Sequence, residues 1–112
     1  ITCNIVVWLW MSKLEELAKK SAALGHPLRL KIIVLLAEEG EDMYLNEIAK
    51  RLGINRALAK IHLKKLEGAD IVKSRVVLVE GEAKALRYYK LQNFDIHVSP
   101  ELLRKEVKNN GN

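Results

Sequence analysis

The stretch from residue 45 to residue 91 constrains the fold of this chain more than any other part of its sequence. Over residues 45–52 the apolar side chains recur at i, i+3, i+4 and i+7, which is the spacing of one buried helical face. Gly53 can take the left-handed conformation that ends a helix, and Asn55 is a good N-cap for a second helix. Because the connection is so short, the pattern predicts a helix-turn-helix over residues 45–67.

Two strand-like segments follow the second helix. Residues 71–79 are rich in β-branched side chains, and residues 86–91 form a return strand after a turn at Glu80-Gly81-Glu82. The two segments therefore predict a β-hairpin over residues 71–91, which is a wing beside the helix-turn-helix.

Helices are predicted on both sides of this unit. Ser12 and Glu15 have the spacing of a capping box, and Pro27 suits the first turn of a helix that is apolar nearly all round and should be the central core helix. Ser99 and Pro100 combine an N-cap with an N1 proline. The helices expected from these signals cover residues 12–24, 27–39 and 99–108.

These elements together predict a mainly α (α+β) fold. The expected architecture is a winged helix-turn-helix with a two-stranded β-wing and with N- and C-terminal dimerisation helices, in a single domain over residues 12–112. Residues 40–44 are expected to be a connector and residues 109–112 a disordered tail. A chain of 112 residues buries limited surface by itself, so dimerisation would add to its stability.

The first eleven residues form an apolar segment that leaves three interpretations open. Residues 5–10 are too few to span a membrane, and the charged region of a signal peptide is missing. The segment is either encoded upstream of a true start at Met11, or a cloning remnant, or a β-strand or dimer-interface segment that buries Trp8 and Trp10. Because an exposed apolar run promotes aggregation, burial against a neighbour is favoured if the segment is ordered.

The second helix of the helix-turn-helix is expected to present a basic face. If Ala59, Leu63 and Leu66 point inward, the outward residues include Arg56, Ala57, Lys60, Ile61 and Lys64. Residues 45–91 hold eleven Lys and Arg against five Asp and Glu, whereas the rest of the chain holds eight against nine. This asymmetry indicates a polyanion-binding face, although the same cations could simply solvate a surface helix.

The predicted contacts with duplex DNA follow from side-chain chemistry. Arg56 can reach a guanine edge, while Ala57 or Ile61 can contact thymine methyl groups. Alternatively the helix reads little sequence and binds mainly phosphates through Lys60 and Lys64. The remaining candidates are Asn55 at the helix start and, for phosphates or the minor groove, the wing residues Lys73, Arg75, Lys84 and Arg87. The alternative role for the wing cations is to protect edge strands from aggregation.

Composition argues against several other functions. No nucleophile and base pair, phosphate-cradling glycine loop or paired carboxylates at useful spacing indicate an enzyme. Aromatic residues make up only 5% of the chain, which disfavours a base-stacking platform for single strands. The one cysteine, Cys3, cannot form an internal disulfide or a cysteine-rich zinc site. We therefore expect no cofactor, no membrane contact and a cytoplasmic location.

The chain resembles the ArsR-like winged helix-turn-helix transcriptional regulators over about residues 22–91. The resemblance rests on Leu24-Gly-His-Pro-Leu-Arg29, Glu47-Ile-Ala-Lys-Arg-Leu-Gly-Ile54, His62-Leu-Lys-Lys-Leu66 and Tyr88-Tyr-Lys-Leu91. It implies a homodimer that binds a palindromic operator, with each recognition helix in a major groove. It also implies that Arg29 is structural or touches the DNA backbone rather than reading bases.

The chain departs from the metal-sensing members of that family. Residues 43–46 contain none of the cysteines of the family's Cys-x-Cys motif. A second family site consists of an Asp-x-His motif and a further histidine about eleven residues later. This chain has the motif as Asp95-Ile96-His97, but Lys108 stands at the position of the further histidine. Zinc needs about four ligands, and His26, His62 and His97 belong to different predicted elements. We therefore expect a member without a metal site and interpret His62 as a semi-buried helix residue.

The terminal helices carry more apolar surface than their own domain requires. The candidate dimer-interface residues are Leu14, Leu17, Leu102, Leu103 and Val107, although packing onto their own domain is an alternative. The leading functional hypothesis is a homodimeric regulator that binds double-stranded DNA in a sequence-dependent manner. The alternative is a winged-helix protein-interaction module without specific DNA binding. Neither an operator nor a small-molecule effector can be inferred from the sequence.

Overall fold

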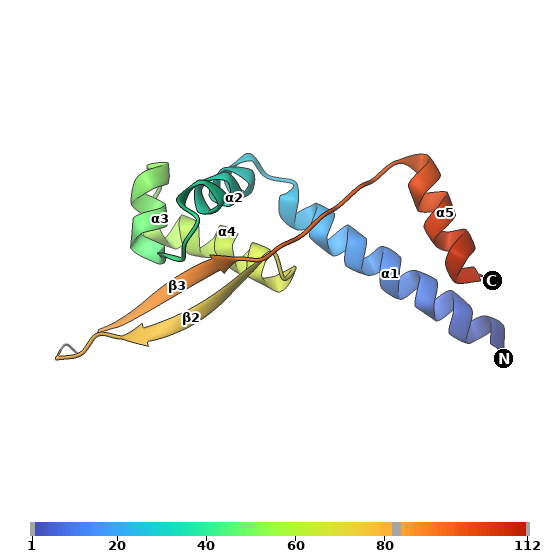
Figure 1. Ribbon diagram of the computed structural model, residues 1–112, viewed down its shortest axis with the longest axis horizontal. Helices are drawn as coiled ribbons and strands as arrows, with labels where there is room; N and C mark the ends of the chain where they lie inside the picture. The colour runs from blue at the N-terminus through green and yellow to red at the C-terminus, as the bar shows by residue number, and fades with distance from the viewer. Residues whose placement is uncertain (1, 82–83, 112) are drawn as a thin grey trace.

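A computed structural model describes the backbone of residues 2–81 and 84–111, and the side chains of residues 13–81 and 84–106. Figure 1 shows the arrangement of the helices and strands. In chain order they are α1 (Thr2–Leu24), α2 (Pro27–Glu39), β1 (Met43–Tyr44), α3 (Leu45–Leu52), α4 (Arg56–Gly68), β2 (Val72–Leu78), β3 (Ala85–Leu91) and α5 (Pro100–Gly111).

The helix-turn-helix forms as the sequence predicts. Gly53 follows α3 in the left-handed conformation, with φ of 69°, and its N–H donates to the carbonyl oxygens of Ala49 and Lys50. The side chain of Asn55 caps α4, because its Oδ1 accepts a hydrogen bond from the Leu58 N–H at 2.7 Å. These two residues fix the turn that sets α4 against α3.

The core lies between α2, α3, α4 and the base of the sheet. Its largest fully buried side chains are Ile32, Met43, Ile48, Leu63, Leu66, Ile71 and Val72. α2 contributes Ile32, Leu35 and Leu36 to the core, in line with the expected central core helix, but Leu30 and Val34 on its other side remain about half exposed. α2 packs against α1, α3, α4 and β3, and these neighbours leave the Leu30–Val34 side uncovered.

The sheet has three strands in the order β1-β3-β2, all antiparallel. The prediction that residues 40–44 are only a connector is therefore wrong, because Met43 pairs with Tyr89 and Tyr44 with Tyr88. Met43 is also fully buried, so β1 contributes to the core as well as to the sheet. Beyond β1 the wing continues as the predicted two-stranded hairpin of β2 and β3.

The terminal helices are longer than predicted. α1 begins at Thr2 rather than at Ser12, so the capping-box pattern lies inside the helix and the backbone of residues 5–10 is helical rather than extended. No glycine or proline interrupts residues 2–24, and a helix without breakers continues once it has formed. α5 reaches Gly111, which contradicts a disordered tail from residue 109.

α1 and α5 pack side by side away from the winged body (Figure 1). Lys13 Nζ on α1 lies 3.2 Å from Glu106 Oε1 on α5. This projection makes the molecule elongated, with principal extents of 59, 27 and 23 Å. No helix in the part of the chain that the structure describes is long and apolar enough to cross a membrane.

Candidate nucleic-acid interface

α4 presents its basic residues to solvent because its apolar residues anchor it from behind. Ala59, Leu63 and Leu66 have no exposed surface. On the opposite face the structure confirms the predicted exposure of Arg56, Ala57, Lys60, Ile61 and Lys64. Ile61 is 59% exposed, so an apolar side chain stands among the cations where it can meet a ligand.

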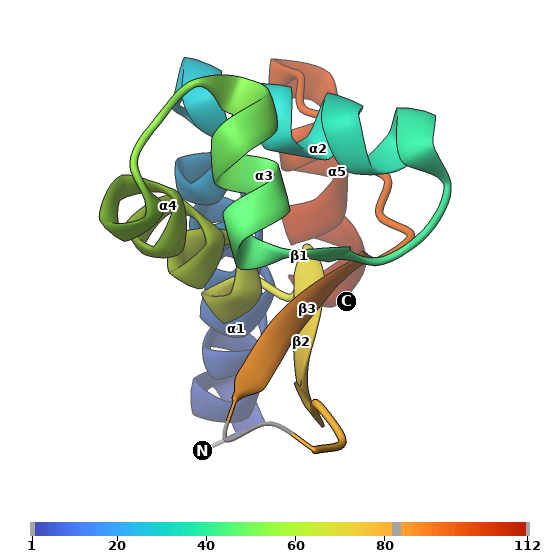
Figure 2. The same cartoon turned by 90° about the vertical axis from the view of Figure 1, so that its left-hand side faces the viewer.

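The wing has two faces of different character, which are set by the register of its strands. Ser74 pairs with Tyr89, and Val76 pairs with Arg87; directly paired residues share a face of the sheet. Tyr89 is 2% exposed and lies against α4, so Arg87 lies on the α4 side of the wing. Figure 2 shows α4 beside this hairpin.

A cleft of about 450 Å³ separates α4 from β3. The residues that line it are Lys60, Lys64, Glu67, Gly68, Arg87 and Tyr89. Burial raises the pKa of the Tyr89 phenol, although the neighbouring Arg87 opposes this shift. The tyrosine therefore stays neutral at physiological pH, and the cleft carries three cations and one carboxylate.

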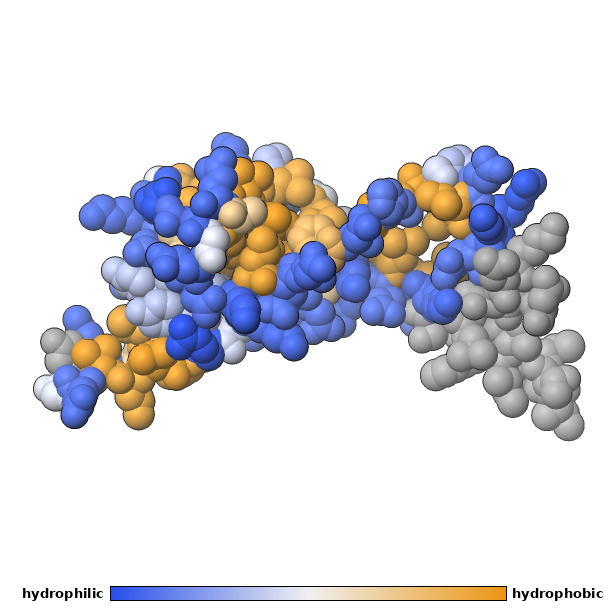
Figure 3. Space-filling view, viewed as in Figure 1, coloured by the Kyte–Doolittle hydropathy of each residue, from blue (hydrophilic) through white to orange (hydrophobic). Residues whose placement is uncertain are grey.

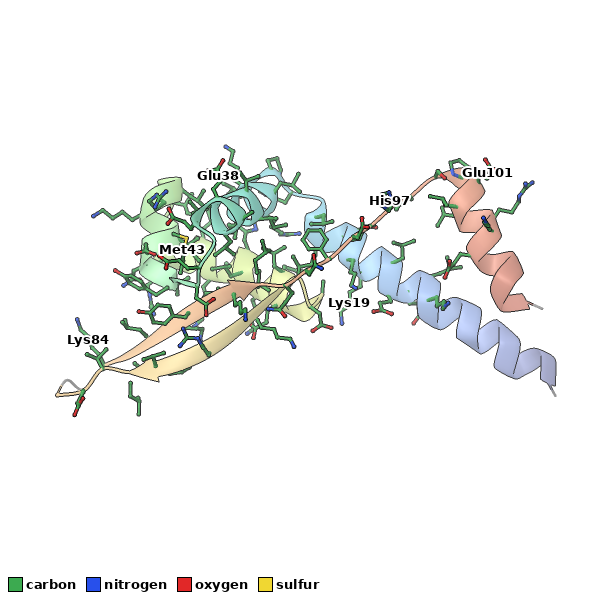
Figure 4. All side chains as sticks on the ribbon, in the orientation of Figure 1. Lys19, Glu38, Met43, Lys84, His97 and Glu101 are labelled. Atoms are coloured by element: carbon green, nitrogen blue, oxygen red, sulfur yellow. The ribbon has the colours of Figure 1, made fainter. Side chains whose placement is uncertain are left out.

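Two of the predicted wing contacts lie on the face that points away from α4. Lys73 and Arg75 alternate with Ser74 along β2 and so share the opposite face. The Nε of Arg75 donates to Asp42 Oδ2 at 3.1 Å, and its guanidinium carbon lies 4.9 Å from the centroid of the Tyr88 ring. Lys84 is exposed near the tip of the wing, where Figure 4 labels it. The structure therefore brings Arg87 close to α4 but not Lys73 or Arg75.

The α4 side of the wing also carries exposed apolar side chains. Val76 is 50% exposed and Leu78 is 79% exposed, and both share the face of Arg87 by strand alternation. Figure 3 shows that the wing carries apolar surface between its polar residues. The α4 side of the wing thus combines Arg87 with exposed apolar side chains.

Two polar residues at this interface were missed by the sequence analysis. Ser74 Oγ lies 2.7 Å from Glu67 Oε1 at the end of α4, and Arg87 Nη1 lies 3.1 Å from Ser74 Oγ. The sequence signal for this contact is weak, because it depends on the pairing of β2 with β3 and on the distance of β2 from α4.

A second polar cluster lies behind α4. Burial, and then the nearby His26 and Arg29, lower the pKa of His62, so its ring is neutral at pH 7 and can accept a hydrogen bond from Arg29 Nε at 3.2 Å. Arg29 Nη1 also donates to the carbonyl oxygen of Ala22 at 3.0 Å. Arg29 therefore makes structural contacts, which is one of the two roles that the resemblance implied, and His62 is more deeply buried than expected, at 5% exposure.

The three histidines lie on separate elements, as expected, but the rings of His26 and His62 meet in space. The ring centroids of His26 and His62 are 4.4 Å apart, and His26 Nδ1 accepts the Leu28 N–H at 3.1 Å as the cap of α2. His97 Nε2 lies 2.8 Å from Asp95 Oδ1 on the surface. Among the residues that the structure describes, no three His, Cys, Asp or Glu side chains converge on a metal position.

The predicted dimer residues gather in one groove between α1 and α5. Its volume is about 470 Å³. Leu14, Leu17, Leu102 and Leu103 all line it, together with residues of the connector that precedes α5. The side chain of Val107, the fifth predicted residue, lies outside the described part of the chain. The groove is thus bounded by both terminal helices.

The helix-turn-helix, the hairpin beside it and the exposed basic helix define a winged helix-turn-helix protein. Residues 26–74 match the bacterial regulatory proteins of the arsR family. The chain is also 37% identical over 97 residues to an uncharacterized HTH-type transcriptional regulator of Methanocaldococcus jannaschii, an alignment that covers 87% of this chain and 98% of that protein. The chain therefore belongs to the ArsR family of winged helix-turn-helix transcriptional regulators, which are not enzymes.

Solved structures share the winged helix-turn-helix fold. One is the homodimeric winged helix-turn-helix DNA-binding domain of a Mycobacterium bovis protein, with 25% identity, a TM-score of 0.60, and coverage of 87% of this chain and 77% of that chain. Reduced HlyU from Vibrio cholerae shares the fold, with 18% identity, a TM-score of 0.58, and coverage of 87% and 86%.

Proposed function

We propose that this protein is a homodimeric transcription regulator that binds double-stranded DNA in a sequence-dependent manner. In this proposal α4 enters the major groove, and the wing contacts the backbone or the minor groove. The observation that carries it is the continuous surface formed by the exposed basic face of α4 and the Arg87 side of the wing. The major groove is about 12 Å wide and admits an α-helix.

The side chains of α4 divide by chemistry into base-reading and phosphate-binding groups. Arg56 at the start of the helix is suited to a bidentate contact with guanine, and the exposed Ala57 and Ile61 are suited to thymine methyl groups. Lys60 and Lys64 lie one turn apart along the cleft, where they would neutralise phosphates. Asn55 contributes first by holding the helix start in place.

The terminal helices support a homodimer. α1 and α5 project from the body, and the groove between them exposes leucines that a second copy could cover. The neighbouring Mycobacterium bovis domain is homodimeric. A two-fold dimer would present two α4 helices to a palindromic site, with half-sites about one helical turn apart.

The test is fluorescence anisotropy of labelled duplexes, one random and one selected for binding, at several salt concentrations. Log affinity should fall linearly with log salt, and Lys60→Ala or Lys64→Ala should each reduce that slope by about one. Lys31→Ala removes an exposed charge from α2, outside this face, and serves as the matched control. If the wild type binds no duplex even at low salt, the proposal fails, and a protein-interaction module becomes the better account.

A further inference from the structure

The contacts of Ser74 have a fixed direction. A serine hydroxyl has one proton, a carboxylate can only accept a hydrogen bond, and a guanidinium can only donate one. Since Ser74 Oγ lies 2.7 Å from Glu67 Oε1 and 3.1 Å from Arg87 Nη1, its proton must point to Glu67 and its lone pair must accept from Arg87. The three residues thus form one ordered relay from α4 through β2 to β3.

This relay holds the Arg87 guanidinium at the edge of the cleft. Arg87 is exposed, and a guanidinium has five N–H donors in a planar fork. The bond to Ser74 uses Nη1, so donors remain for a ligand. Lys60 and Lys64 line the same cleft from α4, and an anion inside it would be approached by cations from the helix and from the wing.

We infer that the cleft between α4 and β3 binds one phosphodiester group of duplex DNA, with Arg87 as its fork-shaped donor and with Ser74 and Glu67 as the residues that position Arg87. This inference rests on the proposed function, because the phosphodiester belongs to the DNA that α4 contacts. It assigns a ligand to the cleft and a role to two residues that carry no positive charge.

The carboxylate of Glu67 distinguishes this arrangement from a simple patch of positive charge. A negative group beside a phosphate weakens binding by repulsion, so on charge alone its removal should strengthen binding in every variant. In the relay Glu67 also orients the hydroxyl that holds Arg87. Replacing Glu67 should therefore affect duplex binding differently, depending on whether the new side chain keeps a hydrogen-bond acceptor for Ser74.

The first experiment compares Arg87→Ala, Ser74→Ala and Ser74→Thr by duplex anisotropy. Arg87→Ala should weaken binding about tenfold and reduce the salt slope by about one. Ser74→Ala should weaken binding about threefold to tenfold without removing a charge, and Ser74→Thr should restore it, because threonine keeps the hydroxyl and suits a strand. Lys90→Ala is the matched control: it removes an exposed cation from the opposite face of β3 and should stay within about twofold of wild type.

The second experiment compares two substitutions of Glu67. Glu67→Gln keeps a carbonyl acceptor for Ser74 and removes the charge, so it should bind duplex at least as tightly as wild type. Glu67→Ala also removes the acceptor and should bind more weakly than Glu67→Gln by about threefold or more. Equal strengthening by both substitutions would mean that Glu67 acts through charge alone, and it would overturn the positioning role.

The outcomes separate this inference from the proposed function. If Lys60→Ala weakens binding while Arg87→Ala and Ser74→Ala leave it unchanged, the protein binds DNA but the cleft does not hold a phosphate as inferred. If the wild type binds no duplex, both fail together.

Two controls accompany these variants. Thermal unfolding of each variant at the assay pH checks that the fold is intact. Arg87→Lys keeps the charge but not the planar fork, so it should recover the salt slope but not the full affinity.

Discussion

Arg29 on α2 donates a hydrogen bond from Nε to Nδ1 of His62 on α4, over 3.2 Å. The Nη1 of the same guanidinium donates to the carbonyl oxygens of Ala22 and Ala23, at 3.0 and 3.4 Å, near the C-terminal end of α1. One side chain thus connects the proposed dimerisation helix, the core helix and the proposed recognition helix. The contact requires a neutral His62, because a protonated imidazole has no acceptor nitrogen.

The neutral state of His62 predicts loss of stability in acid. Its pKa is below the ordinary value of 6.5 because of burial, with His26 and Arg29 adding to the shift. Below pH 6.5 the unfolded chain takes up a proton that the folded chain resists, so the free energy of unfolding should decrease as the pH falls from 6.5 through the folded pKa. Urea unfolding at a series of pH values between about 7.5 and about 5 measures this dependence.

Two variants separate the contribution of His62 from that of the other titrating groups. His62→Asn keeps an acceptor near the position of Nδ1 but cannot titrate, so its stability should depend less on pH in this window. His97→Asn, at a histidine whose side chain is 74% exposed, should keep the wild-type dependence. An unchanged dependence in His62→Asn would show that the ring is not the titrating group.

Leu63 and Ile61 lie on opposite faces of α4 and predict opposite phenotypes. Leu63 is fully buried, so Leu63→Ala should lower the free energy of unfolding by about 2–5 kcal/mol. Ile61 is 59% exposed, so Ile61→Ala should change stability by less than about 0.5 kcal/mol while weakening duplex binding. Chemical denaturation and anisotropy on the same two proteins test both statements, and a large stability loss in Ile61→Ala would contradict the assigned face.

Arg56 and Lys60 should differ in how they affect sequence preference. Arg56→Ala should reduce the difference in binding free energy between a selected and a random duplex by about 1–3 kcal/mol, because a base contact is lost. Lys60→Ala should weaken both duplexes similarly, because a phosphate contact carries no sequence information. Equal losses on both duplexes for Arg56→Ala would remove it from the base-reading set.

The groove between α1 and α5 predicts the effect of an added charge on assembly. Leu102 is 44% exposed in the single chain, and Leu102→Glu would place a carboxylate among the leucines of the proposed dimer interface. The dimer dissociation constant should rise at least about tenfold, since a buried unpaired charge is costly. Sedimentation equilibrium measures this, with Val34→Glu on the exposed side of α2 as the control; a dimer unaffected by Leu102→Glu would place the interface elsewhere.

Periodicity predicted the faces of α4, and together with the signals of Gly53 and Asn55 at the turn it predicted the helix-turn-helix. Ala59, Leu63 and Leu66 repeat at helical spacing over a helix long enough to show it, and the structure buries all three. β1 was not predictable in this way, because Met43 and Tyr44 are too few to show alternation and their partners lie far along the chain. The spacing of Ser12 and Glu15 wrongly predicted a helix start, because a serine three residues before a glutamate also occurs inside helices.

For the candidate site, too, the sequence predicted the residue types but not the contacts between residues that are distant in the chain. The sequence identified the cations of the wing. It did not show that Arg87 lies on the α4 side while Lys73 and Arg75 lie on the opposite face, because the faces depend on how β2 pairs with β3. It also left Ser74 and Glu67 unremarked, since their contact joins a strand to a helix across a cleft. Residue type was readable from the chain, whereas the partner of each residue was not.

The strand register that separates Arg87 from Lys73 also limits how the wing can change length during evolution. Successive side chains of a strand alternate between faces, so a single-residue insertion within β2 or β3 would exchange the two faces for every residue beyond it. Additions between Leu78 and Ala85 leave the pairing of Ser74 with Tyr89 intact. The hairpin can therefore gain reach freely at its tip, whereas near its base only changes of two residues keep the same side chains toward α4.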